Sequence, residues 1–167
     1  MARQPGDLNH DNAFWRFSLA VYGQAEVAKE CLALQDALGL DVNILLFCAW
    51  LGTQSVALKR EDIDEALRAV DDWQDKVVRP LRAVRQRTKA LSGDEEFGAG
   101  IKDAEIKAEQ IEQAMLFALS QQLQGRKSVE GDAVAMNVSR YIEMKYSASS
   151  QASAAHLIKA ARRFASR

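Results

Sequence analysis

The chain has few of the residues that usually carry chemistry. It contains two histidines, two cysteines and two prolines in 167 residues. Neither His10 nor His156 is followed by a second potential metal ligand three or four positions further on, and no Glu-x-x-His pair occurs. The sequence also lacks a Gly-x-Ser-x-Gly elbow and a Walker-type phosphate loop. These absences predict no metal and no cofactor, and they favour a non-catalytic protein.

Long hydrophobic runs and a strong excess of one charge are also missing. The longest apolar run covers residues 44–51, whereas a membrane span needs about 20 residues. No secretory signal is visible at the N-terminus, so we expect a cytoplasmic protein without a membrane span. The net charge of −1 gives no general attraction to nucleic acid. Cys31 and Cys48 lie in apolar patterns and are expected to be buried thiols.

The clearest positive feature is a heptad pattern. Apolar positions alternate at spacings of four and three over residues 63–91 (Ile63, Leu67, Val70, Gln74, Val77, Leu81, Val84, Thr88, Leu91) and again over 101–118. Residues 92–100 between them contain three glycines. The pattern predicts a helical hairpin over residues 60–124. Pro80 is expected to kink the first helix while its apolar seam keeps its phase, and a split into two helices is the alternative.

The rest of the chain is also helical in pattern. A flexible lead over residues 1–8 is followed by a helix that Asn9 or Asp11 can cap, and Gly23 and Gly39 mark helix ends. Residues 42–51 are apolar almost all round, as in a helix that is buried on every side. The sequence therefore predicts an all-α, single-domain helical bundle over residues 1–167. It has seven or eight helices, and the long hairpin packs on the buried apolar helix.

Two groups of polar residues are candidate sites. The first group is near the ends of the first three helices, where polar residues lie among aromatic ones, and it predicts a pocket. Its residues are Trp15, Arg16, Tyr22, Asp36, Asp41, Asn43 and Trp50. In the alternative interpretation these polar groups only form hydrogen bonds and ion pairs within the fold and bind no ligand. Asp41 then caps a helix, Asn43 bonds a neighbouring backbone group, and Arg16 pairs with Asp36.

The second candidate is a basic patch in the long helix. Acidic residues dominate positions 61–75, and basic residues replace them at 76–90, where Arg79, Arg82, Arg85 and Lys89 could bind phosphate, RNA or an acidic partner. The alternative is a solvated face that complements the helix dipole and forms i,i+4 pairs. Glu105, Glu109 and Glu112 share one face of the next long helix, which we also expect to be solvated.

Four blocks of the sequence resemble a known family. They are FWRFSLAVYG at 14–23, CLALQD at 31–36, GLDVNILLFCAWLG at 39–52, and Trp73 followed by VVRPLR at 77–82. In their order these blocks are similar to a family of short bacterial proteins of unknown function, over about residues 12–91. The resemblance implies a cytosolic helical protein and implies no activity or catalytic residues.

Three functions therefore remain open. The missing catalytic groups and the long seamed hairpin favour a protein-interaction module, with an unknown protein partner or a second copy of the chain. The first alternative is a small-molecule or anion-binding protein that uses the pocket candidates. The second is nucleic-acid binding through the basic end of the long helix, which the net charge disfavours.

Overall fold

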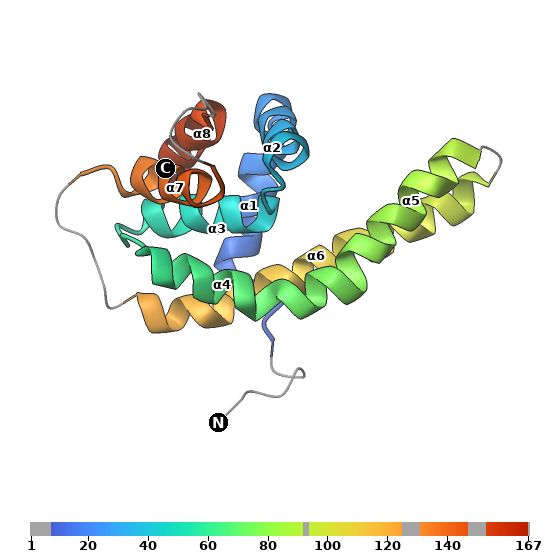
Figure 1. The fold of residues 1–167 in the computed structure, drawn as a ribbon, viewed down its shortest axis with the longest axis horizontal. Coiled ribbons are helices and arrows are strands. Elements are labelled where there is room, and N and C mark those ends of the chain that lie inside the picture. Colours follow the sequence, from blue (N-terminus) through green and yellow to red (C-terminus); the bar gives the residue numbers. More distant parts are fainter. Residues whose placement is uncertain (1–7, 92–93, 125–130, 147–152, 167) are drawn as a thin grey trace.

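The computed structural model describes residues 8–91, 94–124, 131–146 and 153–166. In this part of the chain every regular element is a helix, which confirms the all-α prediction (Figure 1). The α-helices are α1 (Ala13–Tyr22), α2 (Ala25–Leu38), α3 (Val42–Thr53), α4 (Arg60–Trp73), α5 (Arg79–Leu91), α6 (Glu95–Leu123), α7 (Ala133–Lys145) and α8 (Ala155–Ala165). A π-helical turn, η2 (Gln74–Val78), joins α4 to α5.

Local capping explains where the first three helices begin and end. Asn12, rather than Asn9 or Asp11, caps α1, because its Oδ1 accepts a hydrogen bond from the Trp15 amide at 2.8 Å. Gly39 ends α2 in the left-handed conformation, at φ 63°. The predicted cap of α3 is confirmed, since Asp41 Oδ1 accepts from the amide two residues on at 2.8 Å.

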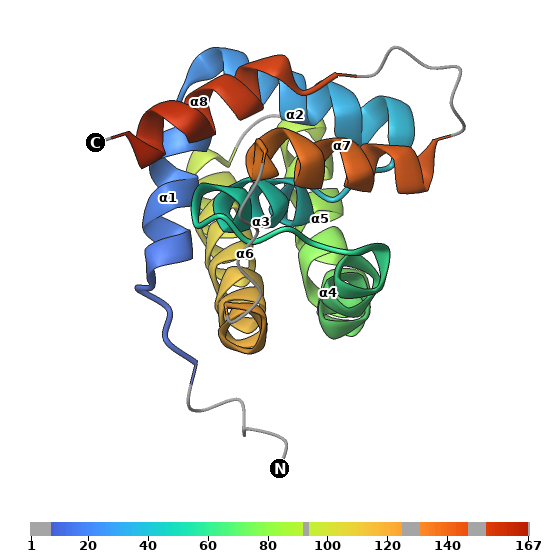
Figure 2. The same ribbon diagram turned by 90° about the vertical axis from the view of Figure 1, so that its left-hand side faces the viewer.

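Helix α3 forms the centre of the fold, as its apolar sequence predicts. Residues 43–52 are all buried. In Figure 2, α3 lies between α7 and α8 on one side and α4 and α6 on the other. Its closest approach is to α7, where a Cβ added to Gly52 would lie 2.4 Å from Val134 Cα. Only glycine fits at this crossing. Cys31 and Cys48 are buried free thiols, as expected.

A buried asparagine holds α7 against the segment that follows α3. Asn137 is fully buried, and its Nδ2 donates to the carbonyl oxygens of Cys48 at 3.2 Å and Val56 at 2.8 Å. Its Oδ1 accepts a hydrogen bond from the Leu58 amide at 2.8 Å. One side chain therefore bonds the end of α3 and two backbone groups of the non-helical segment that follows it, Val56 and Leu58.

The long helix of the hairpin bends at η2 without splitting, as Figure 1 shows. In this turn the Arg79 amide donates to the Gln74 carbonyl, five residues back. The expectation that the seam keeps its phase is wrong. The π-turn adds one residue, so that Val78 is fully buried while Val77, the heptad position, is only half-buried. Pro80 follows directly and has no amide hydrogen to continue the α-helical ladder.

The hairpin has two halves with different surroundings. Its near half, α4 and residues 108–123 of α6, packs under α3. Its far half, α5 and residues 95–107 of α6, projects away from the other helices in Figure 1 and is called the arm below. The helices α1, α2, α3, α7 and α8 are called the body. No helix in the described residues has both the length and the apolar character that a bilayer crossing requires.

Candidate functional site

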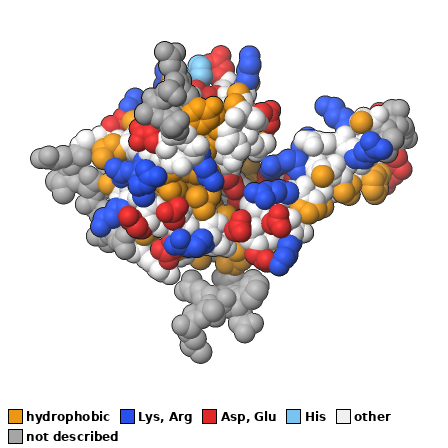
Figure 3. All heavy atoms as spheres, in the orientation of Figure 1, with side chains coloured by type: hydrophobic (Ala, Val, Ile, Leu, Met, Phe, Trp, Pro, Cys, Tyr) orange, Lys and Arg blue, Asp and Glu red, His pale blue; other side chains and the backbone are white. Residues whose placement is uncertain are grey.

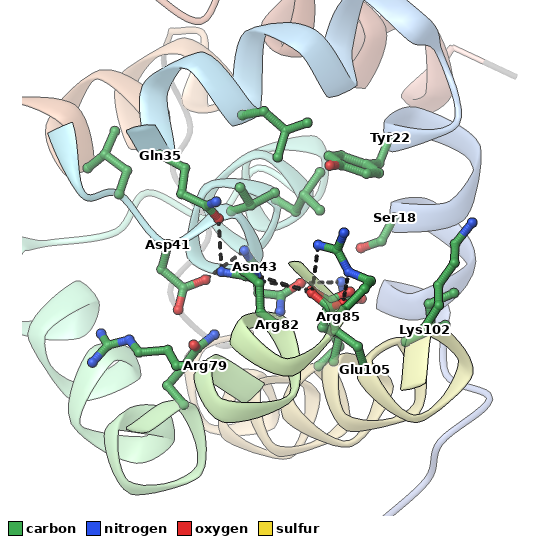
Figure 4. Close-up of a pocket in the computed structure, with 18 of the residues that line it drawn as sticks. Ser18, Tyr22, Gln35, Asp41, Asn43, Arg79, Arg82, Arg85, Lys102 and Glu105 are labelled. Carbon is green, nitrogen blue, oxygen red and sulfur yellow. Dashed lines mark hydrogen bonds and ion pairs between the residues drawn. The ribbon is translucent and has the colours of Figure 1, made fainter. Parts of the chain in front are cut away.

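A cavity of about 820 Å³ lies where the arm leaves the body. Its walls come from α1, α2, the start of α3, η2, α5 and α6 (Figure 4). The space-filling view in Figure 3 shows the surface hollowed between the arm and the body. Small-molecule sites in proteins usually measure about 300–1,000 Å³. We call this space the interhelical cavity.

Most of the predicted pocket residues line the interhelical cavity. They are Trp15, Tyr22, Asp36, Asp41 and Asn43. Trp50 is instead part of the core, where its ring centroid lies 5.2 Å from that of Phe14. Arg16 is on the surface and pairs with Asp11 at 3.4 Å, not with Asp36.

The predicted basic patch meets the same cavity. Arg79, Arg82 and Arg85 line it, whereas Lys89 is exposed further along α5 and does not. Two candidate sets that are well separated in the sequence thus form one site. They come together because the hairpin crosses the body at η2, next to the loop between α2 and α3.

Ion pairs between the two arm helices form one wall. Arg82 Nε lies 3.2 Å from Glu105 Oε1, and Arg82 Nη2 lies 3.1 Å from Glu109 Oε1. Arg85 also pairs with Glu105. The expectation of a solvated acidic face on α6 is wrong, because Glu105 and Glu112 are buried and Glu109 is half-buried. This face of α6 turns toward α5 and the body rather than toward solvent.

Side-chain amides form the floor of the cavity. Gln113 Nε2 donates to Asn43 Oδ1 at 2.8 Å, so Asn43 bonds a side chain and not the neighbouring backbone. Gln74 Nε2 donates to Glu112 Oε2 at 2.7 Å. Sequence reasoning missed Gln74 and Gln113. Gln74 did carry a signal, because it is a polar residue at an apolar heptad position.

Several buried oxygens of this site have no hydrogen-bond partner in the described part of the chain. They are Ser18 Oγ, Glu112 Oε1 and Gln113 Oε1. Ser18 and Gln113 line the cavity and are 3% and 2% exposed. In Figure 4 the Ser18 hydroxyl points into the cavity. Buried polar atoms of this kind are rare in native proteins, since leaving one unpaired costs about 1–3 kcal/mol.

Burial also changes the acidity of the carboxyl groups. It raises the pKa of Glu112 to about 9, and the neighbouring Asp41 carboxyl adds to this effect. Burial likewise raises the pKa of Asp41, against the hydrogen bonds from the Ile44 and Asn43 amides. The pKa of Glu109 is raised by burial too, although Arg82 opposes the shift. Glu112 therefore keeps its proton at neutral pH.

The site is suited to binding through hydrogen bonds, charge and apolar contact. Within the described residues, no group of three or more His, Cys, Asp or Glu side chains is arranged to hold a metal ion. The polar floor of Asn43, Gln74 and Gln113 lies beside an apolar rim. The rim consists of Leu19, Leu32 and Ile106, which are 56%, 45% and 42% exposed.

The chain belongs to the family described as Protein of unknown function (DUF2390), which it matches over residues 13–116. All residues that line the interhelical cavity fall inside this span, from Trp15 to Gln113. Helices α7 and α8 lie outside it. No curated protein and no solved structure matches the chain. The family match thus coincides with the part of the fold that builds the cavity.

Proposed function

We propose that the protein is a non-catalytic binding module that holds a small organic ligand in the interhelical cavity. The observation that carries this proposal is the pair of buried, unpartnered polar atoms, Ser18 Oγ and Gln113 Oε1, in the cavity wall. A bound ligand would supply the missing hydrogen bonds. The cavity volume falls in the range of known ligand sites.

The rim of the cavity further supports a ligand that is partly apolar. Leu19, Leu32 and Ile106 are among the large hydrophobic side chains that the described chain leaves exposed, and all three line this cavity. Trp15 and Tyr22 add half-buried aromatic surface beside them. A ligand with one polar end and one apolar end would match both the floor and the rim.

A thermal-shift screen of small metabolites with cationic, anionic and neutral members tests this proposal. A ligand at 100 times its dissociation constant adds about 2.7 kcal/mol to the free energy of unfolding. The variant Ser18→Leu should abolish the shift, because the larger side chain fills the cavity. Ser139→Leu, at an exposed position on α7, is the matched control and should keep it. A screen in which no compound shifts the wild-type transition would contradict the proposal.

A second candidate is self-association through the arm, which develops the interaction role that the sequence favoured. Val84 and Phe97 on the arm are 42% and 53% exposed. The arm is also self-complementary in charge, with exposed Arg87 and Lys89 on α5 and exposed Glu95 on α6. We therefore take a second copy of the chain as the partner of this surface.

Sedimentation velocity at several protein concentrations tests self-association. The wild-type chain should sediment faster as its concentration rises, and Phe97→Asp should remove this dependence. Met136→Asp is the control, since Met136 is 40% exposed but lies on α7. A wild-type sedimentation coefficient that stays at the monomer value would contradict this candidate.

Ligand binding is better supported than nucleic-acid binding through the basic patch. Arg82 and Arg85 are already paired with Glu105, so they offer less charge to phosphates.

We also keep a bacterial cytoplasmic location as part of the proposal, supported by the two buried free thiols. Cell fractionation of the native host tests the location.

A further inference from the structure

We infer that the ligand places a cation, an ammonium or guanidinium group, against Asp41 and Gln113 at the floor of the interhelical cavity. This inference rests on the proposed function and specifies the chemistry of the ligand. It follows from three features of the site, namely the pairing of its charges, the unpartnered acceptor atom of Gln113 and the position of Asp41.

The cavity is lined by four carboxyl side chains (Asp36, Asp41, Glu105, Glu109) and four basic ones (Arg79, Arg82, Arg85, Lys102), so the pairs they form decide which charge is left open. Glu105 and Glu109 take up the guanidinium groups of Arg82 and Arg85. Asp41 and Glu112 lie close enough together that each alters the proton affinity of the other. Asp41 forms no ion pair with a cation in the described ranges of the chain, whereas Glu112 keeps its proton and needs none. A ligand cation would complete the pairing that the protein leaves open.

The unpartnered oxygen of Gln113 requires a hydrogen-bond donor. Gln113 already uses its Nε2 to bond Asn43, so its free atom is the carbonyl-type oxygen Oε1, which can only accept. A carboxylate group has no hydrogen to give to Gln113 Oε1, whereas an ammonium group carries three.

Asp41 is positioned to receive such a group. Figure 4 shows its carboxyl pointing into the space beside Asn43 and Arg79. Arg79 does not fill this role, because its guanidinium is 62% exposed and pairs with Asp75 at 3.4 Å. Asp41, Gly39, Gln74 and Arg79 also line a second, adjoining cavity of about 200 Å³. Asp41 therefore borders both cavities.

The raised pKa values of the site agree with this assignment. Burial without a matching cation raises the pKa of Glu112 to about 9, and burial also raises that of Asp41. Burial is the largest cause of both shifts, and a positive group bound beside these carboxyls would oppose them.

Three probes with the same hydrocarbon chain test the inference: hexylammonium, hexanoate and hexanamide. Each is titrated into the full-length protein while NMR records the backbone and side-chain amide signals of Asn43 and Gln113. Hexylammonium should bind at least ten times more tightly than either of the other two. Asp41→Asn should weaken its binding at least tenfold, and asparagine keeps the helix cap intact. Asp36→Asn, an exposed position in the same cavity, should change it less than twofold.

The outcomes separate this inference from the proposed function. If hexanoate or hexanamide binds as tightly as hexylammonium, and Ser18→Leu abolishes that binding, the cavity is a ligand site but the cation assignment is wrong. If hexylammonium fails to bind, or binds Asp41→Asn and wild type equally, the assignment is also overturned. The metabolite screen then decides the proposed function by itself.

Discussion

The near half and the arm of the hairpin share one heptad pattern but use it in different ways. In the near half the seam is apolar and buried, with Ile63 and Val70 each 1% exposed. In the arm, Val84 continues the pattern in the sequence but lies beyond the one-residue shift at η2, and it is 42% exposed. The arm helices are held instead by the pairing of Arg82 and Arg85 with Glu105.

The difference comes from what covers each half. The near half lies under α3, so its apolar side chains are removed from water on more than one side. The arm helices have mainly each other, and a two-helix pair cannot bury a full seam. The ion pairs of the arm add less net stability than the burial of apolar side chains does, but they place charged groups at the cavity. The near half is thus structural, and the arm supplies the wall of the candidate site.

The largest expected difference between the two halves is the cost of removing a seam residue. Ile63→Ala should lower the free energy of unfolding by about 3 kcal/mol, because it leaves a cavity in a closed core. Val84→Ala in the arm should change it by less than about 0.5 kcal/mol. Urea unfolding followed by circular dichroism measures both. Equal losses would show that the arm is packed as tightly as the near half.

The ion pairs of the arm can be broken from the acidic side. Glu105→Ala should lower the free energy of unfolding by about 2 kcal/mol, since it leaves Arg82 and Arg85 partly buried without their shared partner. Asp103→Ala, at an exposed position on the same helix, should have little effect. The same urea titration compares the two variants, and a Glu105 variant as stable as the Asp103 variant would mean that the pairs are solvated.

The stability of Glu112→Gln relative to wild type should increase as the pH rises. Burial raises the pKa of Glu112 to about 9 in the folded protein, against about 4.3 in an unfolded chain. The stability contributed by the protonated group is complete below about pH 4 and is lost as the pH rises toward 9, because only the unfolded chain releases the proton. Glutamine stays neutral, so the advantage of the variant should grow by about 1.4 kcal/mol per pH unit from about pH 5 to pH 8.

Urea unfolding at several pH values checks this slope. The titratable groups around Glu112 are Asp41, just before α3, Glu109 on α6 and Tyr141 on α7, and Arg82 on α5 acts on Asp41 and Glu109. Glu143→Gln, at an exposed site on α7, is the control and should show no such trend. A constant difference between Glu112→Gln and wild type would mean that Glu112 is ionised in the folded protein.

The smallest effect is expected at Ser18, in the wall opposite the arm. Ser18→Ala should leave the free energy of unfolding within about 0.5 kcal/mol of wild type or raise it, because the hydroxyl has no partner to lose. Ser120→Ala in the near half should cost about 1 kcal/mol, since its Oγ donates to the Phe117 carbonyl at 2.6 Å. Differential scanning calorimetry measures both variants. A larger loss of stability for Ser18→Ala than for Ser120→Ala would mean that the Ser18 hydroxyl has a hydrogen-bond partner in the folded protein.

Much of the fold could be predicted because it depends on local spacing. Heptad and capping patterns act over a few residues, so the hairpin, the buried α3 and the Asp41 cap were accessible from the sequence. The one-residue shift at η2 was not. A π-turn is rare and has no simple local pattern, and this one places both Gln74 and Val78 in buried positions.

The candidate site was predicted only in pieces. Asp41 and Arg82 each belonged to a candidate set, but the sequence contained no signal that the two sets share a cavity. Glu105 was assigned to a solvated face, because the period of a helix does not say which face a partner covers. The polar Gln74 in an apolar seam was the one available sign of a polar floor beneath the arm.

The sequence by itself determined that this chain folds into helices, which helix is buried, and that few groups for catalysis are present. Those properties depend on residue type and on repeats of three and four positions, which are read along one helix. Only the tertiary structure decided that acidic and basic side chains of the arm pair with each other and that Asp41 is left without a cation. That outcome depends on how helices far apart in the chain cross, because burial and charge pairing are set by neighbours in space.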